Sequence, residues 1–314
     1  MKVGIIDCIV DTDLIDLKIQ KQILKQRRYI YNVKKSSNSH SALIINVLEK
    51  YSLGKLNYYL YEIMEETRGG SCELLIKAMD DAISDSVSVI ILSLTVLKGD
   101  FNRLWKICEK AKEKNIIILC AANNKCSTNS IPAKFSNVIG VGRGIKLKYP
   151  YYSINRSNNI QLLGDVTPEF VLCRGGRYKL FAGTSKATPK MINFIQKESI
   201  SNFIELEKCL QKEFKIEDNM HIVCTIKNYK PSKYIQETLH DITRKYKGTL
   251  ELREEDTLWT EFVENKQDID LMLHQFFDTL NLDVDLLLLN YYDFSTKYRL
   301  CQFVEKRIQE RRGE

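Results

Sequence analysis

The chain has 314 residues, of which 44% are hydrophobic and only 14 are glycine and 5 proline, so it is not a disordered, collagen-like or fibrous protein and has enough apolar mass for a packed core. Its formal net charge is +7, no apolar run approaches the roughly 20 residues needed to cross a bilayer, and Asp7 interrupts what would have to be the core of a signal peptide. Nine scattered cysteines without a CxxC pair favour free thiols, so we expect a cytoplasmic protein with no membrane partner.

Charge is distributed unevenly between the two ends of the chain. Residues 233–314 hold 12 Lys and Arg against 17 Asp and Glu, a net charge of −5, so the remaining residues carry +12. Such an asymmetry indicates two separate units. The basic part has neither an aromatic-interleaved basic stripe nor a nucleic-acid motif, so we expect no nucleic acid partner.

The first 190 residues alternate short apolar runs with helical patterns. Strands are predicted at Val3–Ile6, Leu56–Ile63, Val87–Leu94, Ile116–Ala121 and Val138–Val141. Helices are predicted at Ser41–Tyr51, Cys72–Ile83, Phe101–Lys114 and Thr184–Ser199. Continuous β-branched runs separated by helices predict an α/β fold with a mostly parallel sheet and helices on both faces. In such sheets, ligands bind where strands end in loops that lead into helices.

Four polar residues lie at such ends of the predicted elements. Asp7 closes the first strand, His40 precedes the first helix, Asn124 follows the fourth strand and Ser185 opens the last helix. Acyl transfer requires these four groups, because a hydroxyl needs a base, the base needs an orienting carboxylate, and the oxyanion needs preplaced donors. Taken singly, the acid is an ordinary loop residue, the histidine a cap or core residue, the asparagine a turn residue and the serine an N-cap. Their combination and their order along the chain favour catalysis.

The segments around these residues resemble those of the subtilisin-like serine peptidases, which share the order Asp, His, Ser. The similar segments are Val3–Asp7, His40–Ile45, Ser93–Thr95, Ile131–Ala133, Asn137–Gly142 and Phe181–Pro189. The resemblance covers about residues 1–205. It implies that Asp7 orients His40, that His40 is the general base and acid, and that Ser185 attacks the substrate. It further implies that Asn124 helps to bind the oxyanion, and that Ser93, Leu94 and Thr95 form a strand that pairs with the substrate.

Several residues depart from the pattern of that family. Ser41 replaces a glycine after the histidine, and Leu43 and Lys190 replace histidines. Thr95 and Asn123 replace two glycines that line the pocket for the side chain before the scissile bond. We therefore predict that the substrate-binding residues Thr95 and Asn123 narrow this pocket and select a small residue. No calcium loop is evident, so we expect no metal and no cofactor.

From Lys233 the pattern becomes wholly helical. A peptidase-like domain over residues 1–212 is predicted to be followed by a connector at 213–232, with a strand at His221–Ile226, and by a helical domain at 233–314. Helices are predicted at Lys233–Tyr246, Asp268–Leu280 and Tyr298–Arg311. This order resembles an acyl carrier protein, but Asn265 to Asp268 stand where its phosphopantetheine-bearing serine would be. The resemblance implies a carrier-like domain without a prosthetic group, and an unrelated acidic helical bundle is the alternative.

Two functions from different classes follow from these patterns. The first is a cytoplasmic serine endopeptidase that hydrolyses a dedicated peptide or precursor through an acyl-enzyme on Ser185. The second is a weak or inactive peptidase-like protein that binds a peptide while its acidic domain docks a biosynthetic partner. The four intact chemical residues favour the first function, and the two filled glycine positions favour the second.

Overall fold

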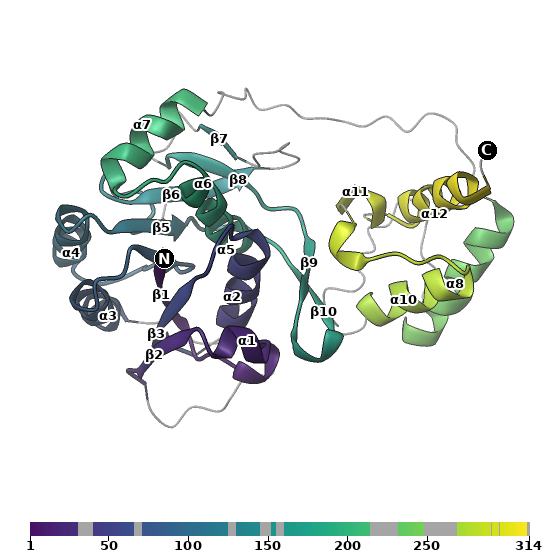
Figure 1. The fold of residues 1–314 in the computed structure, drawn as a ribbon, viewed down its shortest axis with the longest axis horizontal. Coiled ribbons are helices and arrows are strands. Elements are labelled where there is room, and N and C mark those ends of the chain that lie inside the picture. Colours follow the sequence, from purple (N-terminus) through teal and green to yellow (C-terminus); the bar gives the residue numbers. More distant parts are fainter. Residues whose placement is uncertain are drawn as a thin grey trace. The chain divides into compact units, whose positions relative to one another are not determined.

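The fold is described from a computed structural model of the chain (Figure 1). The structure describes residues 1–30, 40–65, 71–124, 130–144, 152–154, 160–213, 232–247, 269–289, 291–294 and 296–312. The chain forms two compact units. The first comprises Met1–Thr167, Cys173–Gly175 and Ala182–His221, and the second comprises Pro168–Leu172, Gly176–Phe181 and Ile222–Glu314.

An eight-stranded sheet forms the centre of the first unit. Its strands are β1 (Lys2–Cys8), β2 (Ile23–Arg28), β3 (Asn57–Met64), β4 (Val89–Leu92), β5 (Ile117–Ala121), β6 (Ile139–Gly144), β7 (Tyr152–Ile154) and β8 (Leu162–Asp165). They lie in the order β2-β3-β1-β4-β5-β6-β8-β7, and every pairing is parallel except that of β7 with β8. The predicted α/β fold with a mostly parallel sheet is therefore confirmed.

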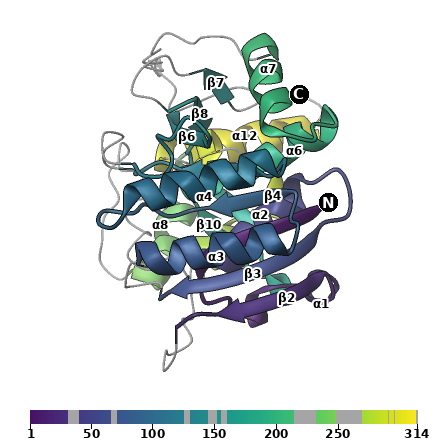
Figure 2. The same cartoon turned by 90° about the vertical axis from the view of Figure 1, so that its left-hand side faces the viewer.

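Helices cover both faces of this sheet, as Figures 1 and 2 show. The helices of the first unit are α1 (Leu17–Gln20), α2 (His40–Tyr51), α3 (Cys72–Ser84), α4 (Phe101–Glu113), α5 (Thr184–Ala187), α6 (Met191–Lys197) and α7 (Phe203–Glu213). Helices α3 and α4 pack side by side on one face, and α2, α5 and α6 pack together on the other. Both strands and helices contribute fully buried side chains to the core, as expected for a sheet covered on both sides.

The order of the strands reverses beside β1. After β1 the chain forms β2 at the edge and β3 between β2 and β1, and then crosses to β4 on the other side of β1. In parallel sheets a crevice forms at the carboxyl ends of the strands where the order reverses. Asp7 lies at this end of β1, and Ser93 directly follows β4.

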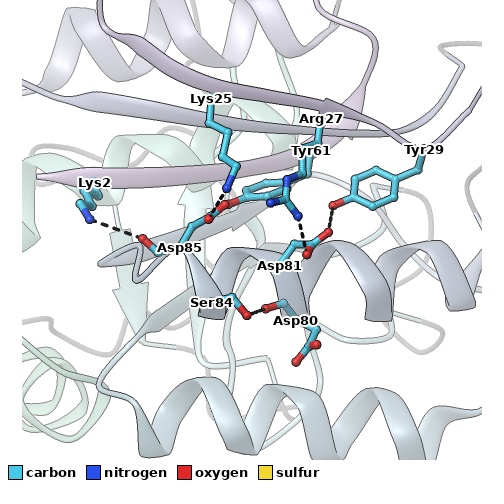
Figure 3. Close-up of polar contacts among 9 residues, drawn as sticks. All are labelled: Lys2, Lys25, Arg27, Tyr29, Tyr61, Asp80, Asp81, Ser84 and Asp85. Carbon is cyan, nitrogen blue, oxygen red and sulfur yellow. Dashed lines mark hydrogen bonds and ion pairs between the residues drawn. The ribbon is translucent and has the colours of Figure 1, made fainter.

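A network of ion pairs and hydrogen bonds joins the edge strand β2 to α3, and Figure 3 shows its residues. Lys25 pairs with Asp85, and Arg27 Nη1 lies 2.5 Å from Asp81 Oδ1. The hydroxyl of Tyr29 donates to Asp81 at 2.5 Å. An edge strand with basic side chains held by a helix is protected against pairing with another chain.

The second unit combines a β-hairpin with helices. Strands β9 (Glu169–Leu172) and β10 (Tyr178–Phe181) pair antiparallel. The longer helices are α8 (Lys233–Lys247), α10 (Ile269–Thr279) and α12 (Lys297–Arg312), with the short α11 (Tyr291–Phe294) beside α12. Phe170 and Leu180 of the hairpin belong to the same apolar core as the helices. The carboxylate of Asp270 binds Arg177 Nε at 2.9 Å and the backbone N–H of Tyr178 at 3.2 Å.

Several elements differ from those predicted. The sequence predicted neither β2, β7 and β8 nor the hairpin, and the predicted connector begins where α7 still continues to Glu213. The predicted helix Thr184–Ser199 is divided into α5, a 3-10 turn at Thr188–Lys190 and α6, because Pro189 cannot donate a backbone hydrogen bond. The predicted strand His221–Ile226 lies outside the described residues. Among the helices that are described, none is both long and apolar enough to cross a membrane.

Candidate active site

Asp7 and His40 are in direct contact at the carboxyl edge of the sheet. Asp7 is 1% exposed near the end of β1, and His40 is the first residue of α2. His40 Nδ1 lies 3.0 Å from Asp7 Oδ1 and 3.2 Å from Asp7 Oδ2. An ionised carboxylate only accepts hydrogen bonds, so this geometry assigns the proton to Nδ1 and leaves Nε2 able to accept one.

The surroundings of Asp7 favour its charged form. Burial raises the pKa of this carboxyl, but the charge and hydrogen bond of His40 and the backbone N–H of Cys8 outweigh it, so the pKa lies below its usual 3.8. The N–H of Cys8 donates to Asp7 Oδ1 at 2.6 Å. Asp7 is thus held as a buried carboxylate whose charge stabilises a protonated His40.

Ser41, which replaces a family glycine, also contacts this pair. Its hydroxyl lies 2.7 Å from the carbonyl oxygen of Cys8 and 3.2 Å from Asp7 Oδ1. The thiol of Cys8 lies 3.3 Å from the Ser41 hydroxyl. Burial and the nearby Asp7 charge raise the pKa of the Cys8 thiol to about 12. The thiol is therefore protonated at neutral pH and is not a competing nucleophile.

Ser185 lies at the start of α5, directly after a tight turn. Gly183 has φ +89°, and a Cβ there would lie 3.0 Å from the side-chain amide of Asn124, so this position requires glycine. The half-buried Ser185 is the second residue of α5, and α5 packs against α2 and β5. The helix that carries Ser185 therefore lies against the helix that carries His40.

Asn124 is hydrogen-bonded to the segment that carries Ser185. It follows β5, and its Oδ1 accepts the backbone N–H of Thr184 at 2.9 Å and lies 3.2 Å from the Thr184 hydroxyl. That hydroxyl donates to the carbonyl of Ala122 at 2.7 Å. Because the amide oxygen is used in this way, the exposed NH₂ group of Asn124 is left to donate to a ligand near Ser185.

The predicted substrate strand borders an apolar pocket of about 200 Å³. Leu94 and Thr95 line it together with Val96, Ile63 and Leu75. The N–H of Val96 donates to the carbonyl of Ile131 at 2.8 Å, which fixes the end of this strand. An apolar residue that lines a pocket has the same sequence pattern as one in the core, so the sequence alone does not indicate that Ile63 and Leu75 line this pocket.

The other two predicted substrate-binding residues are placed differently. Ser93 is 9% exposed, and its side-chain oxygen has no hydrogen-bond partner among the described residues. Asn123 is half-buried, its N–H donates to the Ser130 hydroxyl at 2.9 Å, and it does not line the pocket beside Thr95. The structure therefore places Thr95, but not Asn123, on the wall of this apolar pocket.

One group of residues has the composition of a metal site. The ligand atoms of Asp7, Cys8 and His40 all lie within 4.8 Å of one another. The Asp7 and His40 atoms are already hydrogen-bonded to each other, and the Cys8 thiol is held protonated by burial. The hydrogen bonds of an acid–base pair explain this proximity without a bound ion.

A buried aspartate hydrogen-bonded to a histidine at the carboxyl edge of a parallel sheet, with the helix of that histidine packed against the helix that carries Ser185, fits the acid–base–nucleophile order of serine hydrolases. The model of the Subtilase family matches residues 1–194. The chain belongs to this family. It is 27% identical to Subtilisin NAT of Bacillus subtilis subsp. natto over 212 residues, which cover 60% of this chain and 52% of that protein.

The chain is also similar to other proteases. Identity to an intracellular serine protease of Paenibacillus polymyxa is 24% over 209 residues, covering 60% of this chain and 63% of that protein. The chain spans about half the length of Subtilisin NAT and of Subtilisin E of Bacillus subtilis. A cold-adapted subtilisin-like serine proteinase shares the fold with a TM-score of 0.55 at 19% identity, over 69% of this chain and 84% of that one. A lanthipeptide protease also shares the fold, with a TM-score of 0.52 at 19% identity, over 67% of this chain and 79% of that one.

Proposed function

We propose that the protein is a serine endopeptidase that hydrolyses a dedicated peptide through an acyl-enzyme. The observation that carries this proposal is the hydrogen bond between the buried Asp7 and the partly exposed His40, whose Oδ1 and Nδ1 lie 3.0 Å apart, together with the packing of α2, which begins at His40, against α5, which carries Ser185. The order of these residues and the membership of the Subtilase family support the same reaction.

In the proposed reaction, His40 Nε2 takes the proton of the Ser185 hydroxyl while its oxygen attacks the peptide carbonyl. Asp7 keeps the proton on Nδ1 and stabilises the imidazolium. The NH₂ group of Asn124 and the N–H of Ser185 donate to the oxyanion. The imidazolium then protonates the leaving amine. A water molecule, deprotonated by His40, releases the acid from the acyl-enzyme and restores the Ser185 hydroxyl.

The pocket next to the proposed substrate strand favours cleavage of a particular peptide over cleavage of proteins in general. The pocket beside the substrate strand is small, apolar and bounded by Thr95, which supports selection of a limited set of side chains. Folds of this kind occur in a lanthipeptide protease. We therefore infer that the substrate is a peptide precursor, with a small residue before the cleaved bond.

The second unit is proposed to dock a biosynthetic partner or the substrate itself. Residues 233–314 of this unit carry a net charge of −5, and their helical order is similar to that of a carrier protein, although the position of the attachment serine lies outside the described residues. Seven cysteines within the described part of the chain are free thiols, which supports a reducing, cytoplasmic location.

Labelling with a fluorophosphonate probe tests the catalytic proposal. The Ser185 oxygen would attack phosphorus and expel fluoride, so the wild-type protein should gain the mass of the phosphonyl group. Ser185→Ala should abolish labelling and lower peptide hydrolysis by about 10⁴-fold to 10⁶-fold, and His40→Ala should do nearly the same. Ser84→Ala is the matched control, because Ser84 is exposed on α3 and bonds only within its helix in the described structure.

The same experiment separates the two candidate functions. A wild-type protein that is not labelled, yet binds a peptide, would be the non-catalytic scaffold that the Thr95 side chain on the pocket wall favours. Labelling that persists in Ser185→Ala would contradict the assignment of the nucleophile. Asn124→Ala should lose at least about 10²-fold to 10³-fold in turnover, because it removes an oxyanion donor and also the acceptor of the Thr184 N–H that holds the Ser185 segment.

A further inference from the structure

Lys186, the residue directly after the proposed nucleophile, has a completely buried side chain. Its exposed fraction is 0%, and its ammonium donates to the carbonyl oxygen of Thr167 at 2.6 Å. Asp165 Oδ2 lies 3.6 Å from the same nitrogen. Removing an ammonium from water is costly unless it is paired and hydrogen-bonded, so this placement is held by specific partners.

The partners of Lys186 form a turn at the end of β8. The hydroxyl of Thr167 donates to Asp165 Oδ2 at 2.8 Å, and its N–H donates to Oδ1 at 3.2 Å. Between them, the carbonyl of Val166 accepts the N–H of Gly183 at 3.0 Å. This turn, residues 165–167, therefore holds the chain on both sides of Ser185: Gly183 two residues before it and Lys186 one residue after it.

A second set of bonds holds the same segment independently. Thr184 is tied to Asn124 through its N–H and to Ala122 through its hydroxyl. The residue between Thr184 and Lys186 is Ser185 itself. The position of the Ser185 hydroxyl therefore depends on two anchors, one from the end of β5 and one from the 165–167 turn.

The chain connectivity explains why the second anchor is needed. Between Thr167 and Ala182 the chain forms the hairpin, whose strands β9 and β10 belong to the second unit. Strand β10 ends at Phe181, only a few residues before Ser185. Gly183 and Lys186, which follow the hairpin, are bonded to residues 165–167, which precede it. These bonds keep the proposed nucleophile Ser185 in the first unit.

We propose that Lys186 is a positioning residue for Ser185, which it holds by clamping the nucleophile segment to Asp165 and Thr167. The inference rests on the proposed function of Ser185. It assigns Lys186 no proton transfer, because an ammonium bound to a carbonyl and a carboxylate donates hydrogen bonds and cannot take the proton of the Ser185 hydroxyl.

Lys186→Met tests the clamp, because methionine is unbranched, apolar and fills a similar space. We expect the rate of fluorophosphonate labelling and kcat to fall by about 10-fold to 100-fold with KM within twofold of wild type, since a small misplacement of a reacting atom costs about that much. Lys190→Met is the matched control: Lys190 is also buried and lies 4.4 Å from the centre of the Tyr51 ring. The Lys190→Met variant should be labelled at a rate within about threefold of wild type.

A double variant separates positioning from general stability. Lys186→Met leaves Asp165 as a buried carboxylate without its ammonium partner, which destabilises the fold. Lys186→Met combined with Asp165→Asn removes both charges and should restore the melting temperature. If the clamp positions Ser185, this double variant should still be labelled about 10-fold or more slowly. Labelling at the wild-type rate, in the single or the double variant, would overturn the proposal.

Hydrogen exchange gives a readout that does not depend on catalysis. In the double variant, the peptide that contains Gly183 to Lys186 should exchange at least about tenfold faster than in wild type, because the Lys186 bonds to the 165–167 turn are lost and only the backbone bond of Gly183 to Val166 remains there. The helix α4 should be unchanged. If wild type itself is not labelled, the peptidase proposal fails, and exchange still tests the clamp: unchanged exchange at residues 183–186 would overturn it.

Discussion

Two carboxylates of the first unit, Asp7 and Asp81, both have a lowered pKa but bind different partners. Asp7 is buried at the carboxyl end of β1 and binds His40. Asp81 lies on α3, with a side chain 26% exposed, and binds Arg27 and Tyr29 (Figure 3). In both cases burial raises the pKa of the carboxyl, and hydrogen bonds and a neighbouring positive charge outweigh this, so that both pKa values lie below 3.8.

A lowered carboxyl pKa therefore does not by itself mark a catalytic residue in this protein. The partners decide the role, because an imidazole exchanges a proton near neutral pH, whereas a guanidinium does not. Burial at Tyr29 and its bond to Asp81 raise the pKa of that hydroxyl above its usual range, so it does not ionise either. The β2–α3 cluster, which consists of Arg27, Tyr29 and Asp81, should contribute to stability alone. The Asp7–His40 pair should contribute mainly to turnover.

Asp7→Asn should have the largest effect. An asparagine keeps the shape but holds the wrong tautomer of His40, so kcat should fall by about 10⁴-fold. Asp81→Asn is the matched control and should leave kcat within about twofold of wild type. Steady-state kinetics with a peptide substrate measures both variants. Equal losses in the two would show that the comparison of the clusters is wrong.

The pH dependence of the free energy of unfolding tests whether the ionised Asp7 side chain stabilises the fold. Because the folded-state pKa is lowered, the stabilisation by Asp7 is complete above its unfolded value of 3.8 and is lost as the pH falls through the lower folded value. Below pH 3.8, wild type should therefore lose more stability than Asp7→Asn. Urea unfolding followed from pH 5 downward measures this difference, and parallel curves would contradict it.

Asp270→Ala extends the comparison to the second unit. It should lower the stability of that unit, and this is the next largest effect that we expect. Asp270 is 1% exposed and binds the side chain of Arg177 and the N–H of Tyr178. Because the Arg177 side chain is 49% exposed, water can solvate it when Asp270 is removed, so the main cost is the lost acceptor of the Tyr178 N–H, typically about 1 to 3 kcal/mol. The loss should be seen as unfolding of the second unit at lower denaturant concentration. An unchanged midpoint would mean that the hairpin is not held by this pair.

The sequence predicts much of the first unit because its signals are local. Apolar β-branched runs mark the central strands, and Asp7, His40 and Ser185 lie at the ends of elements, where parallel strands bring them together. The edge strand β2 was missed because its outward residues are polar and charged. It is held by side chains from α3, which are distant in sequence.

The less predictable features depend on contacts that are distant in sequence. Nothing around Phe170 or Leu180 indicates that their partners are helices that follow residue 232. A lysine next to a nucleophile is expected to be exposed, because lysine is seldom buried, yet Lys186 has no exposed surface. The resemblance of the second unit to a carrier protein stays a prediction, since residues 248–268 lie outside the described part.

Thr95→Gly should have a moderate effect on specificity. Thr95 bounds the apolar pocket beside the substrate strand, and overpacking such a pocket costs typically about 1 to 3 kcal/mol. That range corresponds to roughly 5-fold to 150-fold discrimination. Cleavage of a peptide library by the variant should broaden toward Phe, Leu and Tyr. Adding Asn123→Gly should add little, because Asn123 does not line this pocket. A wild-type profile already dominated by large aromatic residues would contradict the prediction.

The smallest effect is expected for the β2–α3 cluster itself. In Asp81→Asn the ion pair with Arg27 is lost, but the amide oxygen can still accept the hydrogen bond of Tyr29. Arg27 is 40% exposed, so solvent screens much of the attraction, and such pairs are worth about 0.2 to 1 kcal/mol. The denaturant midpoint should therefore shift slightly, and the shift should shrink at 1 M salt, where charges are screened within about 3 Å. A loss above about 2 kcal/mol, well outside the range for exposed pairs, would show that this cluster is as essential to the fold as a buried pair.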